Sequence, residues 1–139
     1  METRNNEQAK LSKPKLQKMV GERVCQNLSF AILNLDFNME KYKDKLNPNC
    51  PIYEQKDLVN FYAKAYPFHV GHEIRRAINL LFSCDELIDA HETEDYTHIY
   101  KGIYNYLAGS SEPGLAGVHR TICLLIDYKL NGFIEEVKE

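Results

Sequence analysis

Residues 74–88, which read IRRAINLLFSCDELI, decide the fold class of this chain. Their apolar side chains recur at intervals of three and four residues, the spacing that places them on one face of an α-helix. The arginines and acids fall between them and are left for solvent. The predicted buried face consists of Ile74, Ala77, Ile78, Leu81, Phe82, Leu87 and Ile88. This pattern predicts one long helix that begins after Gly71.

A second helical pattern lies upstream, between Pro14 and about Leu46. Its apolar stripe comprises Leu16, Met19, Val20, Val24, Leu28, Ala31, Ile32, Leu35, Met39, Tyr42 and Leu46. Residues 33–39 also alternate between apolar and polar side chains, which is the period of a half-buried strand. We expect a helix there because the helical stripe continues beyond the alternation and no tight-turn signal precedes it.

Three further helices are expected, at residues 53–65, 96–107 and 115–130. The first ends at the Tyr66–Pro67 step, because a residue before proline avoids helical geometry. Its predicted inner face consists of Leu58, Phe61, Tyr62 and Ala65. We therefore predict an all-α fold, with a flexible polar tail over residues 1–12 and a single compact domain over residues 13–139. The domain is expected to be a bundle of about five helices.

Length and charge limit the classes of protein that fit. The chain has 139 residues, about the length of one domain, and its formal charge is −3, which disfavours a broadly basic nucleic-acid binder. Its polar start lacks the apolar core of a signal peptide, and its apolar runs are far shorter than the roughly 20 residues that cross a bilayer. The four cysteines show no CxxC spacing. We therefore expect a reduced, cytoplasmic protein with no membrane segment.

Histidines are the first candidates for a metal site or for catalysis. His69 and His72 lie three apart without a third ligand. His91 and His98 lie among six acids in residues 85–98, a stretch typical of a solvated corner, with a weakly bound divalent cation as the alternative. Cys123 follows His119 by four residues, but its apolar surroundings would raise the pKa of the thiol. We predict no catalytic residue, no resident metal and no cofactor.

The segment from Tyr66 to Leu81 also resembles a known family. Its parts YPFHVGH and RRAINLL resemble the HPFx(D/E)GN(G/K)R motif and the following helix of the Fic family. Fic proteins are all-α and transfer a nucleotide monophosphate to hydroxyl groups of target proteins. Tyr66 stands where the catalytic histidine of that family belongs, and residues 71–75 stand for a shortened anion-binding loop. The resemblance therefore implies a degenerate, inactive relative, and no site is carried over.

Two surface features point to contacts with other macromolecules. A short predicted helix carries four tyrosines, which it cannot all turn inward, and acids precede it. The predicted partner-binding residues are Tyr96, Tyr100, Tyr104, Tyr106, Glu92, Glu94 and Asp95. Basic side chains are candidates for contacts with phosphates. They are Lys10, Lys13, Lys15, Lys18, Arg23, Arg75 and Arg76.

These patterns favour a small non-catalytic protein that acts through protein–protein contacts, as an inhibitor, an immunity-type protein or a small subunit of an assembly. Its partner would be another protein, or a second copy of the chain in a homo-oligomer. One alternative is a helical subunit of a nucleoprotein complex that contacts nucleic acid through the basic residues. The other is a degenerate Fic-like protein.

Overall fold

The computed structural model of the chain describes residues 12–48, 50–110 and 112–132. Within these residues it contains six α-helices, one short 3-10 helix and no β-strand. They are α2 (Lys13–Lys41), η1 (Pro51–Gln55), α3 (Lys56–Ala65), α4 (Pro67–Leu81), α5 (Cys84–Thr93), α6 (Thr97–Ala108) and α7 (Ala116–Asn131). The predicted all-α fold is confirmed, and residues 33–39 are helical. The predicted tail, apart from Ser12, lies outside the described residues.

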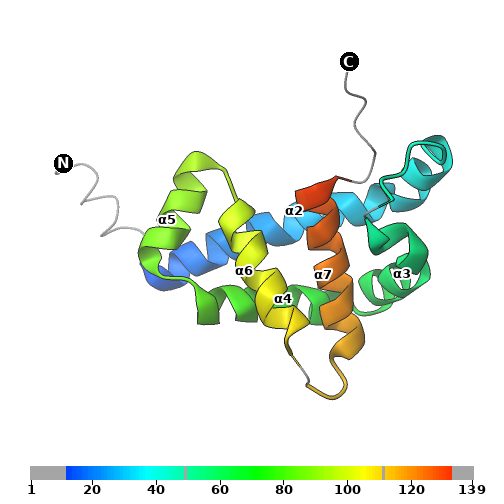
Figure 1. The fold of residues 1–139 in the computed structure, drawn as a ribbon. Helices are drawn as coiled ribbons and strands as arrows, with labels where there is room; N and C mark the ends of the chain where they lie inside the picture. Colours follow the sequence, from blue (N-terminus) through cyan, green and yellow to red (C-terminus); the bar gives the residue numbers. More distant parts are fainter. Residues whose placement is uncertain (1–11, 49, 111, 133–139) are drawn as a thin grey trace.

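The helices pack in two layers (Figure 1). α2 and α4 run across the view, and α6 and α7 cross them in front. α2 contacts α3, α4, α5 and α7, so it packs against most of the other helices. Ser12 begins α2 by accepting a hydrogen bond from the N–H of Lys15, with Pro14 in the first turn. None of the helices in the described residues has the length and apolar character that crossing a membrane requires.

The core is built from one face of α2 and nearly the whole circumference of α7. The buried row of α2 consists of Leu16, Val20, Val24, Leu28, Ala31 and Leu35. α7 is buried on most sides, from Val118 to Ile126 with the exception of Arg120. Ile74 and Ile78 of α4 and Ile99 and Ile103 of α6 join the same core cluster. Burial of this apolar surface, worth about 25 cal/mol per Å², is the main stabilising contribution.

The segment expected to form one long helix forms two. α4 begins at Pro67, ahead of Gly71, and ends at Leu81, after which Phe82 has an extended backbone. α5 begins after Ser83, whose hydroxyl accepts from the N–H of Glu86 at 3.3 Å. The Glu86 carboxylate in turn accepts from the N–H of Ser83 at 2.9 Å. This capping box satisfies two backbone donors at the start of α5. A new helix therefore begins after Ser83, and the predicted continuous helix is interrupted there.

Other boundaries and buried faces also differ from the prediction. The helix expected from residue 53 begins at Lys56, after η1, and Leu81, predicted to be buried, is 36% exposed. α2 ends at Lys41, so Tyr42 and Leu46 follow the helix instead of extending its stripe. In α3 the buried side chain is Val59, whereas Phe61 is 54% exposed and Ala65 is exposed. α3 carries apolar residues around most of its circumference, so spacing alone could not select its inner face.

Candidate binding groove between α2, α3 and α4

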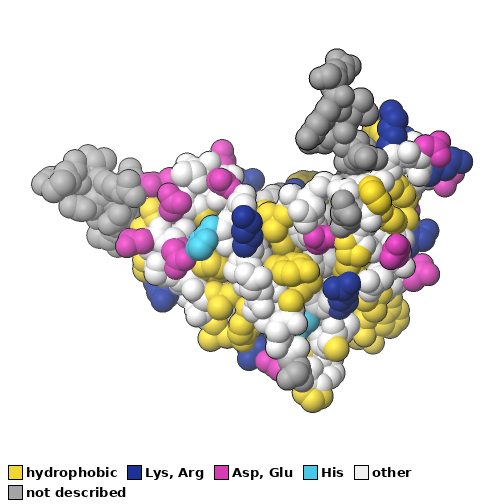
Figure 2. Space-filling view, in the orientation of Figure 1, with side chains coloured by type: hydrophobic (Ala, Val, Ile, Leu, Met, Phe, Trp, Pro, Cys, Tyr) yellow, Lys and Arg dark blue, Asp and Glu magenta, His cyan; other side chains and the backbone are white. Residues whose placement is uncertain are grey.

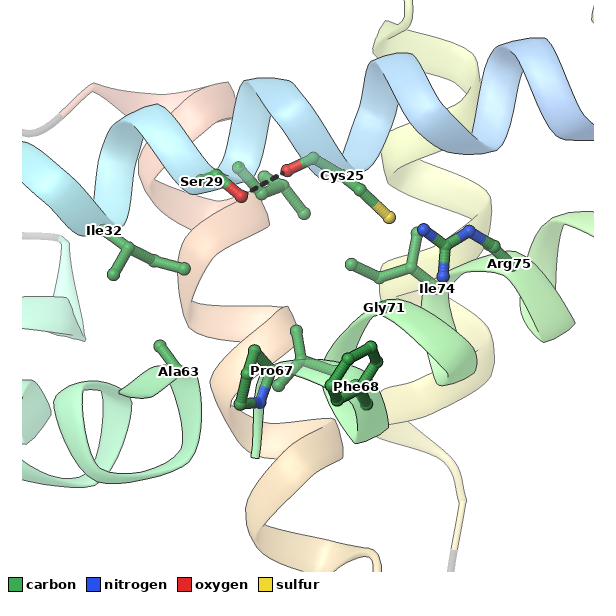
Figure 3. Close-up of a pocket in the computed structure, with 11 residues that line it drawn as sticks. Cys25, Ser29, Ile32, Ala63, Pro67, Phe68, Gly71, Ile74 and Arg75 are labelled. Atoms are coloured by element: carbon green, nitrogen blue, oxygen red, sulfur yellow. Dashed lines mark hydrogen bonds between the residues drawn. The ribbon is translucent and has the colours of Figure 1, made fainter. Parts of the chain in front are cut away.

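An open groove of about 280 Å³ lies where α2, α3 and α4 meet (Figure 3). Cys25, Ser29 and Ile32 of α2 lie along one side, and Ala63 of α3 and the start of α4 lie along the other. Arg75 stands at one end, with its guanidinium pointing back along the groove toward Cys25. The remaining lining residues are Leu28, Pro67, Phe68, Val70, Gly71 and Ile74.

Small side chains and a break between two helices leave this space open. The Tyr66–Pro67 step ends α3 and starts α4, so the two helices contact α2 separately. Ala63 and Gly71 carry little or no side chain into the groove. The Ser29 hydroxyl donates to the carbonyl oxygen of Cys25 at 2.9 Å, so its hydrogen is already used within its own helix. The walls are therefore largely apolar.

Two glycines leave room for the Arg75 side chain. A Cβ atom at Gly21 would lie 3.2 Å from Cγ of Arg75, and one at Gly71 would lie 3.1 Å from its Nη1. The side chain therefore passes Gly21 of α2 and lies against Gly71 of its own helix. Burial raises the pKa of the Cys25 thiol, and the positive charge of Arg75 opposes that rise. Arg75 is thus the charged group at an otherwise apolar site.

Exposed apolar side chains border the groove. Cys25, Ser29, Leu33 and Phe37 follow one another at intervals of four, so they form one row along α2. Leu33 is 77% exposed and Phe37 is 63% exposed, so this row continues beyond the groove as an apolar surface. Phe68 on α4 is 88% exposed. We call Leu33, Phe37 and Phe68 the apolar rim.

The predicted tyrosine surface is mostly enclosed. Tyr96 and Tyr100 are 7% and 6% exposed, and the Tyr100 hydroxyl accepts a hydrogen bond from the Asn27 side-chain amide at 3.0 Å. Tyr104 and Tyr106 are half-buried against the same core. Tyr96 and Tyr100, two of the predicted partner-binding residues, are therefore enclosed, since α4 and α7 pack against α6 and Asn27 of α2 reaches the Tyr100 hydroxyl.

The predicted acidic residues do lie on the surface. Figure 2 shows acidic side chains gathered over α5, and Glu92, Glu94 and Asp95 are all exposed. Glu94 pairs with Arg23 at 3.8 Å. Asp95 accepts from the N–H of Thr97 at 3.0 Å, and hydrogen bonds from the Thr97 hydroxyl and N–H lower the pKa of Asp95. Asp95 therefore contributes to the junction between α5 and α6, and Glu94 links the end of α5 to α2.

Among the predicted phosphate contacts that the structure describes, Arg23 and Arg76 pair with acids of this chain and Arg75 lines the groove. Lys13, Lys15 and Lys18 are exposed at the start of α2, and Lys10 lies outside the described residues. Arg76 donates to Glu112 at 3.1 Å and to Glu73 at 3.4 Å. With Arg23 paired to Glu94 and Arg75 in the groove, the basic side chains serve separate local contacts.

The core contains a buried polar pair that the sequence did not predict. Nε2 of His119 on α7 lies 2.7 Å from Oε1 of Glu73 on α4, and both side chains are about 95% buried. The two residues are 46 positions apart, and nothing in their local spacing signals the contact. His119 therefore pairs with Glu73, although Cys123 follows it by four residues, and the Cys123 thiol donates to the carbonyl oxygen of Tyr104 at 3.8 Å. Burial raises the pKa of the Cys123 thiol to about 11, which keeps it protonated and unreactive at neutral pH.

The other histidines also lack a metal-binding arrangement. His98 lies 2.6 Å from Glu86, and the His69 ring packs against Tyr66. In the described part of the chain, no group of three or more His, Cys, Asp or Glu side chains is placed to hold a metal ion.

The segment that resembles the Fic motif has a different local structure from the one expected. Residues 71–75 lie within α4, so their backbone N–H groups are oriented along a helix and do not form an anion-binding loop. Comparisons with models of protein families, with curated proteins and with solved structures find no match for this chain.

Proposed function

We propose that this protein is a non-catalytic binding protein that holds an amphipathic helix of another protein in the groove between α2, α3 and α4. The observation that carries the proposal is the apolar rim beside this groove. Water contact with large apolar side chains is unfavourable by about 25 cal/mol per Å², and grouped exposure of this kind marks interaction sites. A partner that covers Leu33, Phe37 and Phe68 would remove that cost.

The size of the groove favours anchoring side chains over a free small molecule. Its volume of about 280 Å³ is roughly twice that of a cavity which holds one benzene, and lies below the usual range of about 300–1,000 Å³ for small-molecule pockets. Room for about two large side chains suits a partner that inserts anchors and lies over the rim.

The chemistry of the walls favours a helical partner over an extended one. A helix satisfies its own backbone hydrogen bonds, whereas an extended segment needs donors and acceptors from the surface it binds. The Ser29 hydroxyl is already hydrogen-bonded within α2, and the rest of the lining apart from Cys25 and Arg75 is apolar. An amphipathic helix with apolar side chains three and four residues apart fits these walls.

The predicted tyrosine surface is the weaker candidate for the same role. Tyr96 and Tyr100 belong to the core cluster, so replacing them would test stability before binding. The nucleoprotein alternative has less support as well, because Arg23 and Arg76 face acids of this same chain.

The test is selection of binders from a displayed library of amphipathic helical peptides, followed by fluorescence anisotropy with a selected peptide. Phe68→Ser and Leu33→Ser are expected to weaken binding at least about tenfold, since each removes an exposed apolar anchor. Phe61→Ser is the matched control, because Phe61 is a 54% exposed aromatic residue that does not line the groove. Its effect is expected to stay below about twofold.

Three outcomes would overturn the proposal. The library could yield no binder, or the selected peptides could bind equally well to the Phe68→Ser and Leu33→Ser variants. Alternatively, sedimentation could show that the wild-type protein is a dimer and Phe68→Ser a monomer, in which case the occupant is a second copy of the chain.

A further inference from the structure

We infer that Arg75 makes the groove selective for a helix that carries an aspartate or glutamate beside its apolar anchors. This inference rests on the proposed function and names the chemistry of the partner. Arg75 lines the groove directly and points its guanidinium into it (Figure 3). A carboxylate on the bound helix would meet this guanidinium at the Cys25 end of the groove, while apolar side chains occupy the end near Ile32 and Ala63.

Arg75 differs from the other arginines of the described residues in what it contacts. Arg23 pairs with Glu94, Arg76 pairs with Glu73 and Glu112, and Arg120 donates to Gln55 at 3.5 Å. Within the described part of the chain, Arg75 has neither a hydrogen-bond acceptor nor a carboxylate within ion-pairing distance. A guanidinium beside apolar walls is stabilised when a carboxylate reaches it.

The Arg75 side chain lies close to two glycines, which leave room for it beside α2. A Cβ added at Gly21 would lie 3.2 Å from its Cγ, and one added at Gly71 would lie 3.1 Å from its Nη1. The planar fork of a guanidinium matches a carboxylate through two parallel hydrogen bonds.

The charge of the site fits a carboxylate better than a phosphate. Arg75 is the one basic side chain that lines the groove, whereas phosphate groups on proteins are usually bound by clusters of arginines.

The test is a double-mutant cycle on a peptide from the library selection. Binding is measured for the peptide with its acidic residue and with the isosteric amide, on the wild type and on Arg75→Gln. The Glu-to-Gln change in the peptide is expected to weaken binding about five- to tenfold on the wild type and less than about twofold on Arg75→Gln. Arg75→Lys should recover part of the preference, because it keeps the charge without the fork.

Arg76→Gln is the matched control, since Arg76 is the next residue and pairs with Glu73 and Glu112 outside the groove. This variant should discriminate between the two peptides as the wild type does. If groove-binding peptides show no acid preference, or if the preference survives in Arg75→Gln, the role of Arg75 is wrong and the helix-binding function stands. A preference for phosphoserine over glutamate would also overturn it. If no peptide binds the groove, both proposals fail.

Discussion

Glu73 is the one acidic side chain buried among the residues that the structure describes. Its Oε1 accepts from Nε2 of His119 at 2.7 Å and from Nη1 of Arg76 at 3.4 Å. Burying a carboxylate without such donors lowers the stability of the fold. The polar contact between α4 and α7 therefore depends on both Glu73 and His119. Arg76 also reaches Glu112 at 3.1 Å, which ties the loop before α7 to the same residue.

The first prediction concerns this pair. His119→Ala should lower the free energy of unfolding by about 2–4 kcal/mol, because it leaves Glu73 buried with only the more distant Arg76 donor and opens a small cavity. Urea denaturation followed by circular dichroism measures the change. His72→Ala is the control, since His72 is an exposed histidine 3.9 Å from the same carboxylate. Its effect should stay within about 0.5 kcal/mol. Equal effects of the two variants would contradict the role given to the buried contact.

The boundary between α4 and α5 shows how a local polar contact can decide an element that apolar spacing does not. The apolar positions of residues 74–88 continue through Phe82, Leu87 and Ile88, and all three are buried. The helix nonetheless restarts at Cys84, because Ser83 and Glu86 satisfy each other's backbone donors. Glu86 also lies 2.6 Å from His98, which fastens α5 to α6.

The second prediction follows from the pKa of Glu86. The backbone N–H of Ser83 and then the His98 side chain lower this pKa from its ordinary value of 4.5. Because the folded pKa is the lower one, the contribution of Glu86 to stability is present above pH 4.5 and is lost as the pH falls through the folded pKa. Glu86→Gln should therefore show a shallower loss of stability on acidification than the wild type.

Thermal unfolding between neutral pH and about pH 3 checks this slope. Asp85→Asn is the control, since Asp85 is an exposed acid in the same helical turn and accepts no capping hydrogen bond. Glu86 is partly exposed, so its charge should contribute well below 1 kcal/mol to the free energy of unfolding. Ser83→Ala should lower the free energy of unfolding by about 1 kcal/mol at neutral pH, because it removes the N-cap side chain. A steeper loss in Glu86→Gln than in the wild type would contradict the sign.

At the scale of the whole molecule, helical spacing was sufficient to predict the all-α fold and the buried row of α2. It could not predict the groove, because the groove is made by residues of three helices and by what is missing at Ala63 and Gly71. Helical spacing could not predict the apolar rim for a related reason. Spacing identifies one inner face per helix, and Leu33 and Phe37 lie outside the buried row of α2.

The pairing of Glu73 with His119 and the hydrogen bond between Asn27 and the Tyr100 hydroxyl could not be predicted either. Both depend on which helices become neighbours, and that information lies in packing between segments far apart in the chain. The basic residues illustrate the same limit in part, since Arg23 pairs with an acid 71 positions away and Arg76 pairs with Glu112, 36 positions away, as well as with the nearby Glu73.

The last prediction separates the two faces of α2. Leu28 is 1% exposed and Leu33 is 77% exposed, and both are leucines in the interior of one helix. Leu28→Ala should lower the free energy of unfolding by about 2–5 kcal/mol, because it removes buried methyl groups from the core that α2 shares with α4 and α7. Leu33→Ala should change it by less than about 0.5 kcal/mol, since its side chain is already in water and alanine favours the helix slightly more.

Urea denaturation with an unchanged slope m checks both values. Repeating the denaturation at several protein concentrations shows whether a second copy of the chain covers Leu33, because the contribution of such a side chain to stability depends on protein concentration. A loss above about 1 kcal/mol for Leu33→Ala that grows with protein concentration would place Leu33 in an interface between copies. A small and concentration-independent effect leaves the rim open in the isolated chain, which is the condition that a groove for a partner helix must meet.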